Sequence, residues 1–249
     1  MRPALALLLL AGAWELLAAL GPWPRYLFPA ASEVVAALWR LARSGALGAA
    51  ALKSLSRLGQ GYLLSAALGV PLGVALARSP LLRAAVKPLV VGLQALPSIC
   101  WLPLSLLWFG LTDAAILFVV VMGSLLAVAI AAEDAVAAIP PILLDVSGTL
   151  GVRGPRLYGG VLLPAALPGI LTGLKLGWSF AWRALMAGEL LFVSGGLGQL
   201  LTLGRDLLDV AQVMAVMLAI VAVGVAVDRV VFRALEQRVR RRWGLLGNG

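Results

Sequence analysis

Long apolar stretches, separated by short polar segments, run through most of this sequence. A helix that crosses a bilayer needs about twenty mostly apolar residues, because the hydrocarbon core is about 30 Å thick and each residue rises about 1.5 Å. Six stretches qualify, so we expect an all-α polytopic membrane protein with about six transmembrane helices. The predicted spans cover residues 4–20, 58–77, 88–110, 114–132, 165–193 and 210–230 of a single membrane domain, residues 1–249.

Three of these spans have features of their own. The first could pass for a signal peptide, but Trp14 and Glu15 interrupt its apolar run and more spans follow, so we expect an uncleaved helix. The third contains Pro97 and Pro103, each of which lacks a backbone donor and should bend the helix inside the membrane. The second has small residues at helical spacing, which predict close helix approach: Gly61, Ser65, Gly69 and Gly73.

The segment 24–57 reads as a surface helix rather than a span. Ser32 is placed to cap a helix that begins near Glu33. The apolar residues recur at helical spacing, opposite the charged ones: Val34, Val35, Leu38 and Leu41 against Glu33, Arg40 and Arg43. We expect this helix to lie along the outer surface of the membrane.

Composition supports the membrane class. Of the 249 residues, 62% are hydrophobic and only 12% are charged, whereas a soluble domain is nearer half apolar and a quarter charged. The net charge of +9 does not indicate nucleic-acid binding, because the basic residues flank apolar spans instead of forming a stripe with interleaved aromatics. Anionic lipid head groups of the bilayer are their expected contacts.

The distribution of basic residues predicts the topology. Twelve lie on one face of the predicted bundle and six on the other. Because the more basic face is usually cytoplasmic, both termini are expected in the cytoplasm. The twelve are Arg2, Arg78, Arg83, Lys87, Arg153, Arg156, Arg229, Arg233, Arg238, Arg240, Arg241 and Arg242; the six are Arg25, Arg40, Arg43, Lys53, Arg57 and Arg205.

Several kinds of chemistry are missing from the sequence. There is one cysteine, Cys100, and no histidine, so we expect no disulfide framework and no metal site. No phosphate-binding loop, zinc-protease motif or serine elbow is present, and we expect no catalytic residues and no cofactor. The chain is therefore not expected to be an enzyme.

The longest predicted cytoplasmic loop, 133–163, contains the most distinctive pattern. Residues 140–164 read as a short amphipathic helix, a glycine turn and a second short helix that leads into the fifth span. Gly151 permits the positive φ that such a turn uses. Pro164 is expected to start the next helix, where no amide donor is needed. An ordinary helix-loop-helix on the membrane surface would be the plainer interpretation.

This loop resembles the cytoplasmic signature of bacterial ABC importer permeases, which reads Glu-Ala-Ala, three residues, Gly, nine residues, Ile-x-Leu-Pro. The matching positions are Asp145-Val146-Ser147, Gly151, and Val161-x-Leu163-Pro164, so the start is degenerate and the spacing is kept. Further phrases resemble the nitrate, sulfonate and taurine branch, and they span nearly the whole chain. They include Leu27-Phe28-Pro29, Trp108-Phe109-Gly110, Gly173-Leu174-Lys175 and Gly196-Leu197-Gly198.

The resemblance implies a type I ABC importer permease fold in the bacterial inner membrane. It implies that the loop forms coupling helices for a separate ATPase, with Asp145, Ser147, Gly151, Arg153, Arg156 and Pro164 as the coupling residues. The implied partners are two ATPase subunits, a second permease copy in a homodimer, and an extracytoplasmic substrate-binding protein. The implied solute is a small anion such as a sulfonate, taurine or nitrate.

Ionisable residues inside spans are costly and are therefore functional candidates. The fifth span has Lys175, Arg183 and Glu189. Lys175 and Glu189 lie close enough to its ends to reach water. Arg183 lies deeper, and its guanidinium could bind an oxyanion or pair with another helix, for instance with Glu189 of a second copy. Trp178 and Trp182 flank Arg183 and, with Arg183 and Glu189, are candidates for a translocation pathway, although packing is the more ordinary role for tryptophan.

An ion-gradient-driven secondary transporter is the main alternative. It should show inverted repeats and acidic residues near the midplane of the membrane. The sequence shows no repeat, and its acids lie near the ends of the spans. A membrane-embedded enzyme would need a cluster of histidine, cysteine or carboxylate residues, which is also lacking.

Overall fold

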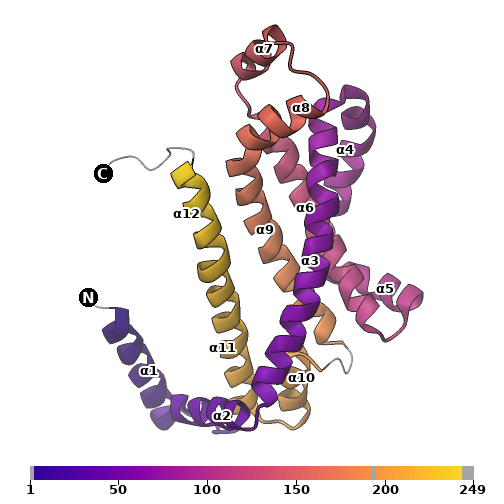
Figure 1. The fold of residues 1–249 in the computed structure, drawn as a ribbon. Helices are drawn as coiled ribbons and strands as arrows, with labels where there is room; N and C mark the ends of the chain where they lie inside the picture. The colour runs from indigo at the N-terminus through magenta and orange to yellow at the C-terminus, as the bar shows by residue number, and fades with distance from the viewer. Residues whose placement is uncertain (1–2, 192–194, 243–249) are drawn as a thin grey trace. The chain divides into compact units, whose positions relative to one another are not determined.

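A computed structural model describes residues 3–191 and 195–242, and all regular structure in these residues is helical (Figure 1). The helices are α1 (Pro3–Leu20), α2 (Ala31–Arg43), α3 (Ala46–Arg78), α4 (Pro80–Gln94), the 3₁₀ helix η1 (Ser98–Trp101), α5 (Leu102–Phe109), α6 (Asp113–Ala137), α7 (Pro141–Thr149), α8 (Pro155–Leu157), the π turn η2 (Tyr158–Leu162), α9 (Leu163–Glu189), α10 (Leu197–Asp206), α11 (Val210–Val227), the π turn η3 (Asp228–Phe232) and α12 (Arg233–Arg242).

Four helices within the described ranges are long and apolar enough to cross a membrane, or five if one bent pair counts as a span. They are Ala46–Arg78, Asp113–Ala137, Pro155–Glu189 and Val210–Val239, with Pro80–Gln94 and Ser98–Phe109 as the pair. The all-α membrane fold is thus confirmed. The first predicted span, residues 4–20, coincides with α1, whose 18 residues reach about 27 Å across a core of about 30 Å.

The bend expected in the third span is present at Pro97. The chain leaves α4 after Gln94, and η1 with α5 continues at 101° to it. Pro103 causes no bend of its own, because it lies in the first turn of α5, where a helix needs no amide donor. The two halves of this predicted span are therefore separate helices.

The described chain forms two compact units. The first contains α1, α2, the start of α3, α10 and most of α11, and the second contains the rest of α3, α4 to α9, η3 and α12. That the whole chain is a single membrane domain stays a prediction.

The segment 24–57 is only partly as expected. Helix α2 is present, but it begins at Ala31 with Ala30 as the N-cap, where the Glu33 carboxylate accepts a 3.0 Å hydrogen bond from the Ala30 amide. The predicted Ser32 cap is wrong, since the Ser32 hydroxyl donates to Glu15 at 2.8 Å. The apolar face of α2 buries Val34 and Ala37 against Ala215 of α11, and α3 already begins at Ala46.

In the second unit, α6 packs closely against α3 and α9. A Cβ atom added at Gly69 of α3 would lie 2.8 Å from the Leu125 carbonyl oxygen, and one at Gly73 would meet the Ala129 oxygen and lie 2.7 Å from the Ala132 Cβ. Ser124 of α6 donates a 2.7 Å hydrogen bond to the hydroxyl of Ser65. The small-residue face predicted in the second span therefore packs within the subunit.

Candidate functional site

The segment 140–164 begins with the short helix α7, which ends in a glycine turn. Gly151 has φ +70°, a conformation that side chains disfavour. The amide of Val152 donates to the Ser147 carbonyl at 2.9 Å and the amide of Gly151 to the Gly148 carbonyl at 3.1 Å, which closes the C-terminus of α7. The predicted short helix and glycine turn are both present.

The exit of this segment corrects the prediction for Pro164. A second glycine, Gly154 with φ +58°, precedes a continuous helix from Pro155 to Glu189. Pro164 lies inside this helix, directly after the π turn η2, where the Leu163 amide donates to the Tyr158 carbonyl. A wide turn here is the physical consequence of a proline that offers no amide to the preceding turn. The helix therefore starts at Pro155, where the predicted turn 151–155 ends.

The segment is anchored on one side and open on the other. Leu144 and Leu157 pack against a buried cluster of the second unit that includes Val136 and Leu162. Ser147 is also buried, and its hydroxyl donates to the Leu144 carbonyl at 2.7 Å. In Figure 1, α7 lies past the ends of α6 and α9 of the same unit. The segment is thus a knob held at the end of a helical bundle.

The open side of α7 is apolar. Ile142, Val146 and Leu150 are 64%, 48% and 74% exposed, and their i, i+4, i+8 spacing places them in one row, here called the α7 stripe. Asp145, Arg153 and Arg156 are exposed around it. The stripe was not predicted, although its spacing is visible in the sequence, because the helical phase is ambiguous in so short an apolar run.

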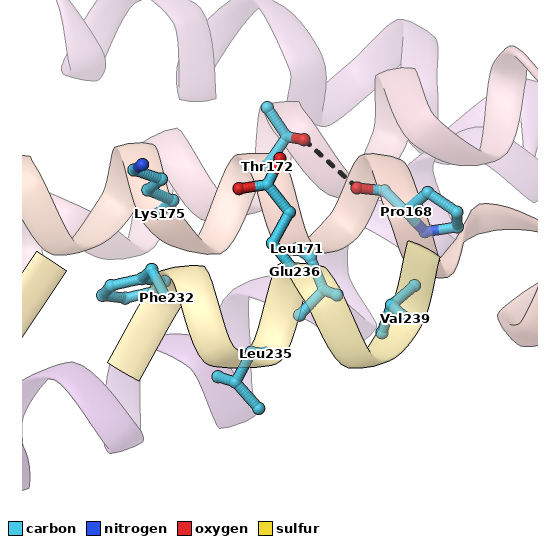
Figure 2. Close-up of a pocket in the computed structure, with 8 residues that line it drawn as sticks. All are labelled: Pro168, Leu171, Thr172, Lys175, Phe232, Leu235, Glu236 and Val239. Atoms are coloured by element: carbon cyan, nitrogen blue, oxygen red, sulfur yellow. Dashed lines mark hydrogen bonds between the residues drawn. The ribbon is translucent and has the colours of Figure 1, made fainter. Parts of the chain in front are cut away.

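Lys175, the first of the three charged residues of the fifth span, forms an ion pair. Its ammonium lies 3.1 Å from the carboxylate of Asp228 in η3. Both residues are partly exposed, so the ion pair is compatible with the predicted access to water. Lys175 also lines a cavity of about 440 Å³ between α9 and the η3–α12 segment, with Phe232 and Glu236 on the opposite wall (Figure 2).

The prediction that Glu189, the third charged residue, reaches water is wrong. Its side chain is 0% exposed, and the Ser54 hydroxyl lies 2.7 Å and 2.9 Å from its two oxygens. The carboxylate also accepts a 3.1 Å hydrogen bond from the Gly198 amide, and the Leu197 amide donates to Ser54 at 2.9 Å. Glu189 therefore joins α3, α9 and the start of α10 within the first unit, and a pair with Arg183 of a second copy is not supported by this burial.

Arg183 is exposed in the second unit. Its Nε donates to the Ser179 carbonyl at 3.1 Å, and its guanidinium lies over the ring of Phe180 at 4.7 Å. Among the residues that the structure describes, no carboxylate lies within ion-pair distance of it. Arg183 lines a cavity of about 260 Å³ at the bend between α4 and η1, together with Gln94 and Ser98.

The two tryptophans do not line the Arg183 cavity. Trp178 packs edge-on against Tyr62 with ring centroids 5.2 Å apart, and against Phe232 at 5.7 Å. The Tyr62 hydroxyl donates to the Leu174 carbonyl at 2.7 Å. Trp182 is half-buried on α9. The contacts of Trp178 agree with the packing role that we weighed for it.

Glu133, which we assigned to the cytoplasmic loop, is instead a buried residue of α6. It is 0% exposed, and its carboxylate lies 2.7 Å from Arg83 and 2.9 Å from Lys87 of α4. This group of charges was not predictable from local sequence, because the partners of Glu133 lie 50 and 46 positions away. These ion pairs hold the N-terminal half of α4 against α6, close to the point where the chain leads into α7.

Comparison with known proteins places this geometry in context. A family model described as "Binding-protein-dependent transport system inner membrane component" matches residues 69–241. A putative ABC transporter permease of Methanocaldococcus jannaschii is 33% identical over 71% of this chain, which spans 66% of that protein's length. The taurine transport system permease TauC of Escherichia coli is 28% identical, with 75% of this chain and 67% of its own length covered.

A relative covered over more of its length is the putative aliphatic sulfonates transport permease SsuC of Bacillus subtilis. It is 28% identical over 91% of this chain and 82% of its own length. Among solved structures, one of the inward-facing MetNI methionine ABC transporter matches with a TM-score of 0.60 and 23% identity, over 76% of this chain and 95% of that one. This likeness supports the fold, in which about three quarters of the chain takes part.

Proposed function

Because the chain belongs to the family of binding-protein-dependent transport system inner membrane components, we propose that it is the permease subunit of an ATP-driven ABC importer. In this role it forms the path by which a solute crosses the membrane, while a separate ATPase hydrolyses ATP. The apolar α7 stripe is the observation that carries the proposal, since it lies outside the bundle and nothing in the described chain covers it.

The α7–α8 knob is suited to docking on another protein. Three exposed apolar side chains in one row offer an area that water disfavours, and the anchoring of Leu144 and Leu157 makes the knob rigid. The charged residues Asp145, Arg153 and Arg156 form a polar rim, as in other protein interfaces. The turn at Gly151 holds α7 at a set angle to the helix that begins at Pro155. A displacement of α7 by a docked partner would thereby move the long helix that ends at Glu189.

The proposed assembly has two ATPase subunits, a second copy of this permease in a homodimer, and an extracytoplasmic substrate-binding protein. Relatives named as permease proteins of transport systems and the MetNI transporter support the ATPase and binding-protein partners. The excess of basic residues on the α7 face supports cytoplasmic termini. The inner membrane is the proposed location, as in the description of the family.

A small anion is the proposed solute. Similar proteins are named for taurine, aliphatic sulfonates, bicarbonate and nitrate, which are all small and carry anionic oxygens. Arg183 is the proposed pathway residue, because it is a cation in a span that faces a cavity. We assign Glu189 and Trp178 to positioning and packing within the pathway's walls, and leave Trp182 beside Arg183 as a secondary candidate.

Co-expression of the chain with candidate ATPase and substrate-binding subunits tests the proposal. A detergent-stable complex whose uptake of labelled taurine, nitrate or bicarbonate requires ATP and the binding protein is the expected result. The alternative, a secondary transporter, predicts uptake by the lone chain in liposomes under an ion gradient. Gradient-driven uptake without an ATPase would refute the importer.

A further inference from the structure

We propose that Arg183, Gln94 and Ser98 form an oxyanion-binding site inside the membrane, in the cavity at the α4–η1 bend. The inference rests on the proposed function only for the source of the anion. Three kinds of donor converge here: a guanidinium, a side-chain amide and a hydroxyl. The remaining wall is largely apolar and includes Leu93, Leu126 and Phe180.

The charge of Arg183 is the first reason. A cation in a membrane span is expensive unless it is paired, and four other cations of the same unit have carboxylate partners. Arg57 lies 2.5 Å from Asp113, Lys175 lies 3.1 Å from Asp228, and Arg83 and Lys87 share Glu133. Arg183 differs, because its only described polar contact is the bond from Nε to a backbone carbonyl. Its terminal nitrogens therefore remain available to an anion that enters the cavity.

The orientation of the guanidinium is the second reason. The ring of Phe180 lies 4.7 Å from it and the Ser179 carbonyl holds Nε, so the guanidinium is held at two points. A held guanidinium presents its paired donors as a fork, which matches two oxygens of a sulfonate, nitrate or bicarbonate. Neither Gln94 nor Ser98 has a described hydrogen bond from its side chain, so both can turn toward the ligand.

The cavity results from the bend between α4 and η1 together with a close helix contact at Gly123 of α6. The 101° bend opens space beside Gln94 and Ser98. Gly123 of α6 keeps the facing wall close, since an added Cβ there would lie 2.7 Å from the Ala184 Cβ and 3.2 Å from the Ser98 Cβ. A volume of about 260 Å³ accommodates a small oxyanion with some waters, each of which occupies about 30 Å³.

An ion pair with a second copy is the competing explanation for Arg183. The carboxylates of Asp113, Asp228, Glu133 and Glu189 are already engaged within their own unit. Asp134, exposed near the end of α6, is the acid that a second copy could offer. This explanation predicts that Asp134→Asn has the same effect as loss of Arg183, and that exchanging the two charges restores transport.

The experiment uses the complete complex in proteoliposomes, with labelled taurine, nitrate and bicarbonate as probes. Arg183→Gln should lower uptake about tenfold to a hundredfold, the range for losing a hydrogen-bonded charge, in a complex that assembles with wild-type yield. Arg183→Lys should restore part of the uptake, and Ser98→Ala and Gln94→Leu should raise KM about two- to tenfold. Arg205→Gln is the matched control, since Arg205 pairs with Asp206 on the surface and should leave uptake unchanged.

Three results would overturn the site. They are normal uptake by an intact Arg183→Gln complex, normal uptake by a variant in which the charges of Arg183 and Asp134 are exchanged, and transport of none of the three anions by a complex that hydrolyses ATP. Failure of the proposed function is distinguishable from these, because the wild-type chain would then neither assemble with an ATPase nor need ATP for uptake.

Discussion

Replacing Gly73 with alanine tests the tightest helix contact in the second unit. The added Cβ would meet the Ala129 carbonyl oxygen and lie 2.7 Å from the Ala132 Cβ, so two helix backbones must separate. Overpacking of this kind costs about 1–3 kcal/mol. A glycine-to-alanine change inside a helix also gains about 1 kcal/mol through propensity. The net effect at Gly73 alone is therefore small and uninformative.

Gly92 of α4 provides the matched control. An added Cβ there meets nothing within 4 Å, so Gly92→Ala should show the propensity gain alone. The difference between the two variants isolates the overpacking cost of about 1–3 kcal/mol. For a chain of this size, 1 kcal/mol shifts Tm by roughly 2–4 °C, so Gly73→Ala should melt roughly 2–12 °C below Gly92→Ala.

Thermal loss of the monodisperse complex, followed by size-exclusion chromatography with fluorescence detection, measures this difference. Both variants must first show wild-type yield at low temperature, which establishes that each one inserts and assembles. Equal melting temperatures would refute the close approach of α3 and α6 at Gly73.

Three further predictions concern the knob and the buried carboxylate. Gly151→Val, at φ +70°, should cost about 1–2 kcal/mol locally and reduce ATP-driven uptake, whereas Gly148→Val, where an added Cβ meets nothing, should reduce it far less; equal losses in uptake assays would contradict a role for the turn. Leu150→Asp should weaken co-purification of the ATPase about tenfold or more without lowering permease yield, and retention at the wild-type ratio would count against docking on the α7 stripe. Ser54→Ala removes a hydroxyl bonded to buried Glu189 and should destabilise the chain by about 1–3 kcal/mol, measured by the same melting assay; an unchanged Tm would contradict that contact.

The broad features of the fold were predictable because they depend on local composition. Runs of about twenty apolar residues predict helices in a membrane, and the helices at 46–78, 113–137 and 155–189 contain three of the predicted spans almost completely. The glycine turn was predictable for a similar reason, since Gly151 sits between two short apolar runs and only glycine adopts its positive φ easily.

The errors arose where distant residues decide the outcome. Glu189 looked accessible from its place near the end of a span, but its carboxylate is buried and accepts a hydrogen bond from the hydroxyl of Ser54, 135 positions away. Ser32 looked like a helix cap by local rules, but Glu15 offered its hydroxyl a better acceptor. Pro164 looked like a helix start, but the preceding π turn accommodates it inside a longer helix. Predictions of caps, helix starts and solvent access from neighbouring residues do not include the tertiary partner that decides the outcome.

The Arg183 cavity was only half predictable. The sequence identifies an arginine deep in a span, and the high cost of such a charge marks it as a candidate. Gln94 and Ser98 could not be connected to it, because their placement depends on the 101° bend at Pro97 and on the packing that Gly123 allows.

Site-specific cross-linking is the most direct test of the central claim, that this permease receives work from an ATPase through α7. With the exposed Cys100 changed to serine, a cysteine at Val146 in the α7 stripe is compared with one at the exposed Val35 on α2. Short bifunctional maleimides applied to the purified complex should join Val146→Cys to the ATPase subunit, with a yield that changes when ATP is bound. They should not join Val35→Cys to the ATPase subunit. A cross-link between Val35→Cys and the ATPase subunit would contradict the account, as would the absence of one from Val146→Cys in a complex that still transports.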